Sequence, residues 1–328
     1  MANAGHVTER RGPALTRARE GCFNRPMAAR KNAAPSLSAR VALPGCAKGA
    51  DSVELDPEGN FALLGGFPGL WAVDLTTGAE TRRFRRDTGY VLWNARISRD
   101  GARVVGAFGD CTMQAWDART GDVIATFPTH GAIVTRISLS RDGARALTVS
   151  GNKEVRLWDL VAKREIASHV MKKSFAIAGA LSPDGRCAAY GGTDGFLRCR
   201  DLEANVDRWT AEGSGWIEDV DVSADGRFFV SGGRGKAVVI WNAATGERVR
   251  SLSLGANIAM VGVSPDGRFA TARAGKKPPP VWDVETGALV ATLGEHDGNV
   301  RSIRFGHDAR SVATTDDGGT LRVFELLS

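Results

Sequence analysis

The sequence has few cysteines and no long apolar run, and these two shortages narrow the class of protein. Its five cysteines (Cys22, Cys46, Cys111, Cys187 and Cys199) are an odd number without close pairing. This argues against the disulfide framework of a secreted domain and favours a reducing, cytoplasmic compartment. No stretch approaches the run of about 18 apolar residues that marks a membrane-spanning helix. We therefore expect no membrane partner.

Groupings of residues that would indicate catalysis are missing as well. The five histidines show no metal-ligand spacing, and neither Cys-x-x-Cys nor Gly-x-Ser-x-Gly occurs. The segment 231–236 (Ser-Gly-Gly-Arg-Gly-Lys) resembles part of a phosphate-binding loop. It lacks the glycine five residues before Gly235, however, and has Ala237 where a hydroxyl would bind magnesium. We predict turn glycines there, and no enzyme activity, cofactor, metal or small-molecule substrate.

A short turn-like motif recurs along the chain at an almost constant interval. Its copies are Asp56–Gly59, Ser98–Gly101, Ser140–Gly143, Ser182–Gly185, Ser223–Gly226, Ser264–Gly267 and the degenerate Gly306–Ala309. The fourth positions lie 42, 42, 42, 41, 41 and 42 residues apart. Asp and Gly tolerate the backbone angles of a tight reversal, so each copy predicts a β-hairpin turn. The interval indicates seven structural repeats.

The residues around each turn predict four short antiparallel strands per repeat. An alternating segment such as 133–139 precedes the turn, and a strand of small residues such as 144–149 follows it. A third strand ends in an aromatic–acid pair, and a second glycine turn, as at Gly121, leads to a fourth strand. Four such strands in about forty residues form one blade of a β-propeller.

The ends of the third strands make the resemblance specific. They read Trp116-Asp117, Trp158-Asp159, Trp241-Asn242 and Trp282-Asp283, with weaker forms at Val73-Asp74, Arg200-Asp201 and Phe324-Glu325. Together with the repeated turns, this pattern resembles the WD-repeat family of β-propellers over residues 37–328. The resemblance implies an all-β, seven-bladed propeller of four-stranded antiparallel blades. It also implies a non-catalytic scaffold for protein–protein interaction, with the Trp-Asp pairs as core and turn residues.

The resemblance further implies a hydrogen-bonded set of His, Ser or Thr, Asp and Trp in each blade. This sequence keeps that set poorly: His130 and His296 occupy the His position, Asp110 and Asp194 the Asp position, and Asn152 replaces the acid in the third blade. No blade retains all four groups. We therefore expect stability to depend more on apolar packing between blades.

The two ends of the repeat region are expected to meet. The last repeat ends after its third strand, and an unpaired outer edge would be left exposed. Residues 38–43 resemble the fourth strand 288–293, so we predict that they complete the last blade and close the ring.

Residues 1–36 are predicted to be a basic, disordered tail. Residues 1–40 hold eight basic and two acidic side chains, which accounts for the whole net charge of +6. The tail is either a disordered extension, a segment upstream of a true start at Met27, or a basic arm for nucleic acid, acidic lipid or a transit receptor. A nucleic-acid-associated propeller that uses this tail and the Lys276–Lys277 loop is the first alternative function.

Charged residues also recur on the strands expected to line the centre of the ring: Glu54, Arg96, Arg136, Asp219, Asp221 and Arg304. Because both signs are present on separate blades, we predict that they form ion pairs across the channel. A small-ligand or enzymatic site in this channel is the second alternative function.

Partner binding is expected on the face formed by two sets of loops, those between blades and those that join second to third strands, where propellers of this family commonly bind partners. Positions seven and five residues before each turn serine should lie on that face. The candidates are Trp93, Phe175 and Trp216 as anchors, with Val91, Ile133, Ile177, Glu218 and Arg301 around them. Exposed apolar residues with a polar rim, tryptophan above all, are typical of protein interfaces, so we expect a protein or peptide partner.

Overall fold

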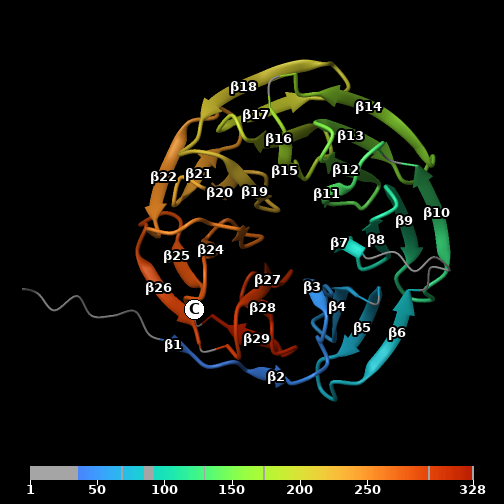
Figure 1. Ribbon diagram of the computed structural model, residues 1–328, viewed down its shortest axis with the longest axis vertical. Helices are drawn as coiled ribbons and strands as arrows, with labels where there is room; N and C mark the ends of the chain where they lie inside the picture. The colour runs from blue at the N-terminus through green and yellow to red at the C-terminus, as the bar shows by residue number, and fades with distance from the viewer. Residues whose placement is uncertain are drawn as a thin grey trace, which may run out of the picture. The chain divides into compact units, whose positions relative to one another are not determined.

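The computed structural model describes residues 36–67, 69–84, 92–128, 130–172, 174–294 and 296–326. Within these residues every regular element is a β-strand, and none forms a helix of the length and hydrophobicity needed to cross a bilayer. The predicted tail, apart from Ser36, lies outside the described residues, as does Val91. Residues 34–328 form one compact unit, in which the blades follow one another around a ring (Figure 1).

Seven antiparallel sheets make up the ring. Blade one consists of β3 (Ala50–Leu55), β4 (Phe61–Gly66), β5 (Leu70–Asp74) and β6 (Glu80–Phe84). Blade two consists of β7 (Leu92–Ile97), β8 (Arg103–Phe108), β9 (Thr112–Asp117) and β10 (Val123–Pro128). Blade three consists of β11 (Val134–Leu139), β12 (Arg145–Ser150), β13 (Glu154–Asp159) and β14 (Arg164–Val170). Blade four consists of β15 (Ala176–Leu181), β16 (Cys187–Gly192), β17 (Phe196–Asp201) and β18 (Val206–Glu212).

The remaining blades repeat the same order from the centre outward. Blade five consists of β19 (Ile217–Val222), β20 (Phe228–Gly233), β21 (Ala237–Asn242) and β22 (Arg248–Ser253). Blade six consists of β23 (Met260–Val263), β24 (Phe269–Arg273), β25 (Pro280–Asp283) and β26 (Leu289–Leu293). Blade seven consists of β27 (Val300–Phe305), β28 (Ser311–Asp316), β29 (Leu321–Glu325) and, from the other end of the chain, β2 (Val41–Leu43).

The predicted closure of the ring is confirmed. Strand β2 pairs antiparallel with β29, placing Val41 opposite Val323 and Leu43 opposite Leu321. The strand is shorter than the predicted 38–43, and it satisfies the outer edge of the last blade. A further contact was not predicted: β1 (Ser36–Leu37) adds to the outer edge of blade six, parallel to β26.

The recurring turn motif owes its residues to one hydrogen-bonding pattern. In blade three, the Ser140 hydroxyl donates to Asp142 at 2.6 Å and accepts the backbone N–H of Arg145 at 2.9 Å. The Asp142 carboxylate also accepts the N–H of Ala144, and Gly143 takes a φ of 62°. These hydrogen bonds, the one from Ser140 first, hold the pKa of Asp142 below its usual value. The same serine–aspartate bond occurs in blades two, four, five and six.

The hydrophobic core lies between blades and not within one blade. Seven clusters of buried residues are present, one at each blade-to-blade interface. One cluster joins blade seven to blade one, with Leu321 and Val323 against Leu64 and Trp71. Apolar packing between neighbouring blades therefore connects the whole ring, as the sequence indicated.

The Trp-Asp pairs lie where the resemblance implies. Trp158 is buried, and its Nε1–H donates to the Thr148 hydroxyl at 2.8 Å. That hydroxyl also contacts His130 Nε2 at 2.8 Å, and His130 Nδ1 contacts the Glu154 carboxylate at 3.0 Å. Glu154 thus replaces the acid that is missing at Asn152. Blade three has a complete network in spite of its departure from the family's set.

Candidate functional site

The loop face is the surface formed by the loops between blades together with the loops that join the second and third strands within a blade. Each innermost strand begins at this face, so the residues just before it or at its start are presented there. Four predicted residues from the consecutive blades two to five are exposed on it. Their exposed fractions are 51% for Trp93, 41% for Ile133, 53% for Phe175 and 40% for Trp216.

Two of these aromatic rings are held by cations from neighbouring loops. The guanidinium of Arg234 lies 3.9 Å from the centre of the Trp216 ring, and the Lys153 ammonium lies 4.6 Å from that of Phe175. Arg234 is itself fixed, because its Nε donates to Glu218 Oε1 at 2.8 Å. Cation–π contacts at exposed sites stabilise such an arrangement by about 0.5–1 kcal/mol. In this structure Glu218, predicted to contact a partner, positions the arginine over Trp216.

The other predicted residues differ in their surroundings. Ile177 is half-buried, and its carbonyl accepts a hydrogen bond from the Thr135 hydroxyl at 3.1 Å. Arg301 is exposed on blade seven, where it forms an ion pair with Asp317 and lies 3.8 Å from Asp51. The loop face therefore presents exposed apolar residues at blades two to five and paired charges at blades seven and one. Val91 lies outside the described residues.

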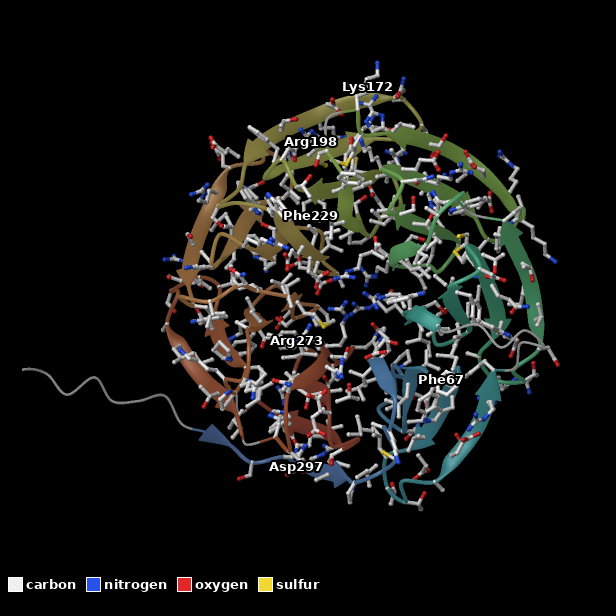
Figure 2. All side chains as sticks on the ribbon, viewed as in Figure 1. Phe67, Lys172, Arg198, Phe229, Arg273 and Asp297 are labelled. Atoms are coloured by element: carbon white, nitrogen blue, oxygen red, sulfur yellow. The ribbon has the colours of Figure 1, made fainter. Side chains whose placement is uncertain are left out.

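One exposed aromatic residue on the loop face was missed by the sequence analysis. Phe67 follows the second strand of blade one, and its side chain is 65% exposed. Its N–H donates to the carbonyl of Gly49, which fixes the loop beside the start of the first strand (labelled in Figure 2). The sequence feature that predicts this exposed position is an apolar residue directly after two glycines. The predicted positions lie in or beside the loops between blades, whereas Phe67 lies in the loop that joins β4 to β5.

The predicted ion pairs across the channel are confirmed for Glu54, Arg96, Arg136, Asp219 and Arg304, whereas Asp221 forms no ion pair with a described residue. Arg136 Nε lies 2.8 Å from the Asp219 carboxylate, which joins blade three to blade five. Glu54 lies between Arg96 at 3.1 Å and Arg304 at 3.5 Å. Burial, and then the charge of Arg304, lowers the pKa of Arg96 to about 10. Guanidinium nitrogens gather at the centre of the ring in Figure 2.

The same channel residues also hold neighbouring blades together. Asp219 accepts the N–H of Val261 and Asp221 accepts the N–H of Val263, each at 3.0 Å. Burial would raise the pKa of Asp219, but the charges of Arg136 and Arg304 keep it below its usual value. These side chains satisfy the inner edges of the innermost strands, which have no further strand to pair with. Across the described parts of the chain, no group of three or more His, Cys, Asp or Glu side chains could hold a metal ion.

Within the glycine-rich segment 231–236, residues 231–233 end strand β20 and residues 234–236 form the predicted turn to β21. A Cβ on Gly235 would lie 1.6 Å from the carbonyl oxygen of Ser214. Only glycine permits so close an approach of the two backbones. The segment therefore has a structural reason for its glycines that involves no phosphate.

The comparisons with known proteins agree with this architecture. The family model "WD domain, G-beta repeat" matches residues 121–159, 206–242 and 287–325. These matches contain the first three strands of blades three, five and seven. In those blades a Thr or Ser hydroxyl bonds to Trp158, Trp241 or His296. The search of curated proteins finds no match.

Among solved structures, a chain in "Crystal Structure of Mitotic Checkpoint Complex" has a TM-score of 0.78 to this one at 17% identity. The alignment covers 95% of this chain and 99% of that chain. At this identity the likeness concerns the fold alone. The chain is thus a seven-bladed β-propeller of four-stranded antiparallel blades, one of them extended by β1, and three of its repeats match the WD-repeat model.

Proposed function

We propose that this propeller is a non-catalytic scaffold that docks a protein or peptide on its loop face. The observation that carries the proposal is the series of exposed apolar side chains at Trp93, Ile133, Phe175 and Trp216. They come from four consecutive blades, so they form one side of the ring opening. Large apolar residues exposed together, with charged residues beside them, are typical of protein interfaces.

The chemistry around the aromatic residues suggests the character of the partner. Lys153 and Arg234 lie against the rings of Phe175 and Trp216, and the latter cation is already paired with Glu218. The Lys153 ammonium lies beside the Phe175 ring, so it could pair with an acidic side chain of a partner whose neighbouring apolar side chain packs on that ring. A segment that presents apolar side chains next to an acidic residue would fit this surface best. The fixed rings would also lose little conformational freedom on binding.

Affinity capture from a native lysate tests the proposal. The bait proteins are the wild type, Trp93→Ala/Trp216→Ala, and the matched control Val123→Ala/Leu289→Ala, whose residues are exposed on the outer strands β10 and β26. Urea unfolding confirms that each bait is folded. Tryptophan hot spots contribute about 2 kcal/mol or more, so partners should be held by the wild type and the control and lost from the Trp variant. A Trp variant that retains the same partners would show that these side chains do not form the interface.

A further inference from the structure

The channel opens on the opposite, turn face into a cavity of about 160 Å³. The second residue of the repeated turn contributes to its lining in six blades. These residues are Arg99, Arg141, Pro183, Ala224, Pro265 and His307. Because the ring repeats, each of these six turns presents one side chain to the same opening. The composition of the turn therefore sets the chemistry of the cavity.

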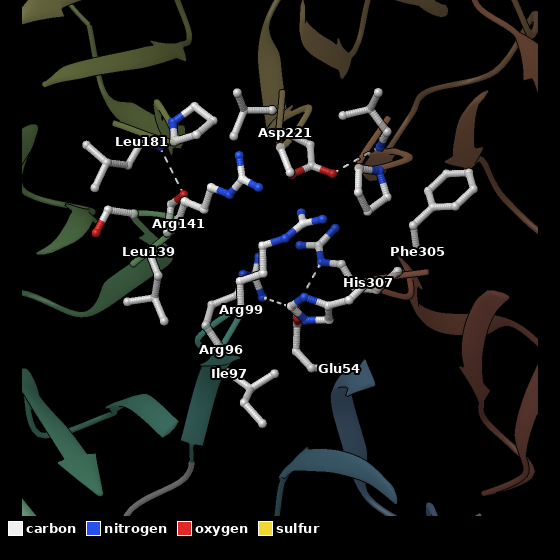
Figure 3. A pocket seen from close by; sticks show the side chains of 18 of the residues that line it. Glu54, Arg96, Ile97, Arg99, Leu139, Arg141, Leu181, Asp221, Phe305 and His307 are labelled. Carbon is white, nitrogen blue, oxygen red and sulfur yellow. Dashed lines mark hydrogen bonds and ion pairs between the residues drawn. The ribbon is translucent and has the colours of Figure 1, made fainter. Parts of the chain in front are cut away.

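One side of the cavity is basic, and two of its charges are unpaired. Arg96 and Arg304 lie deeper and share Glu54, as described above. Arg99 and Arg141 have no carboxylate or hydrogen-bonding partner for their guanidinium groups among the described residues. Figure 3 shows both side chains extending into the cavity. The four arginines carry four positive charges, and the carboxylates of Glu54 and Asp221 carry two negative ones. The lining therefore has two positive charges in excess.

The titration of neighbouring groups agrees with this excess of positive charge. Burial, and then the charge of Arg141, lowers the pKa of Arg99. Burial, and then the charge of Arg99, lowers the pKa of His307. An anion placed between Arg99 and Arg141 would relieve their mutual repulsion.

The other side of the cavity is apolar. Leu181 and Pro183 of blade four and Val263 and Pro265 of blade six line it. The backbone N–H of Arg141 donates to the Pro183 carbonyl at 2.9 Å, which holds the basic side against the apolar one. A cavity of about 150 Å³ is large enough for benzene. The space therefore fits an anionic group attached to an apolar part no larger than one ring.

We propose that this cavity binds a small phosphate monoester, with the phosphate between Arg99 and Arg141 and the apolar part against Pro183 and Pro265. A phosphate monoester carries about 1.5 to 2 negative charges near pH 7, which matches the two excess positive charges. A carboxylate would neutralise only one of them. Arginine also binds phosphate oxygens with geometric specificity. The sequence analysis predicted no small-molecule substrate but kept a small-ligand site in the channel as its second alternative function, and the proposed site corresponds to that alternative.

Calorimetric titration of the full-length protein with phenyl phosphate tests the proposal. Benzoate and benzyl alcohol are the probes of lower charge, and a phosphotyrosine peptide represents the same group on a protein. We expect phenyl phosphate to bind most tightly and benzyl alcohol not to bind. Loss of two hydrogen bonds to a charged group should weaken phenyl phosphate at least about tenfold in Arg99→Gln/Arg141→Gln. The control Arg119→Gln/Arg186→Gln removes two exposed arginines from the same face and should bind as the wild type does.

A second variant distinguishes binding inside the cavity from a general effect of surface charge on binding. Ala224→Leu keeps every arginine but fills the apolar side, and it should also weaken phenyl phosphate by about tenfold. Three results would overturn the proposal: no binding by the wild type, unchanged affinity in Arg99→Gln/Arg141→Gln or Ala224→Leu, or an equal loss in the control. Tighter binding of the phosphotyrosine peptide than of phenyl phosphate would overturn the assignment to a free small molecule.

Discussion

Blades two and three each contain a buried tryptophan, but only the tryptophan of blade three belongs to a hydrogen-bond network. Comparing the two positions tests whether that network stabilises the blade. Trp158 donates to Thr148, which continues through His130 to Glu154. Gly106 occupies the position of Thr148 in blade two, so the buried Nε1 of Trp116 has no hydrogen-bonding partner among the residues that the structure describes. Both rings lie in equivalent places between blades. Replacing each tryptophan by phenylalanine therefore removes similar packing but a different amount of hydrogen bonding.

The structure gives the size of the difference. Trp158→Phe loses a hydrogen bond of about 1 kcal/mol and leaves the Thr148 oxygen with one fewer donor. Trp116→Phe removes a buried donor that is already unsatisfied, whose burial costs about 1–3 kcal/mol. Since the packing losses are similar, Trp158→Phe should lower the free energy of unfolding by about 2–4 kcal/mol more than Trp116→Phe does.

Urea unfolding of the two variants and the wild type measures this difference. In a Thr148→Val background the hydroxyl is gone, so Trp158→Phe should cost much less than it does in the wild type. The coupling between positions 148 and 158 then isolates the hydrogen bond from the packing. Equal losses for the two tryptophans, or additive effects at 148 and 158, would refute the claim that this network stabilises blade three.

Three further outcomes follow from burial and from ring closure. Burial lowers the pKa of His130, so the unfolded chain binds a proton that the folded chain does not. The free energy of unfolding should fall as pH decreases from about 7 to about 5, and less steeply in His130→Gln; equal slopes would contradict this. Trp158→Ala should cost about 3–5 kcal/mol in a urea titration, and an unchanged midpoint would place the ring outside the core. Deleting residues 1–44 removes β2 and should lower the melting temperature far more than deleting 1–36, so equal values would argue against the closure.

The sequence by itself determined the number of blades, their turns and the closing strand. This was possible because each turn is specified within about five residues. Ser140, Asp142 and Gly143 bond to one another and to the adjacent backbone, and the same serine–aspartate bond occurs in all the repeats of blades two to six. The exposure of Trp93, Phe175 and Trp216 was likewise predictable from their fixed distance to the turn.

Only the tertiary structure decided which side chains meet across blades. Nothing near Asn152 in the repeat pattern indicates that Glu154 supplies the missing acid, because the bond depends on where His130 is placed. The turn residues Arg99 and Arg141 are visible in the sequence, yet they share a cavity with Pro265 only because the ring closes. Contacts within a turn depend on local chain geometry, whereas contacts across the channel depend on the packing of all seven blades.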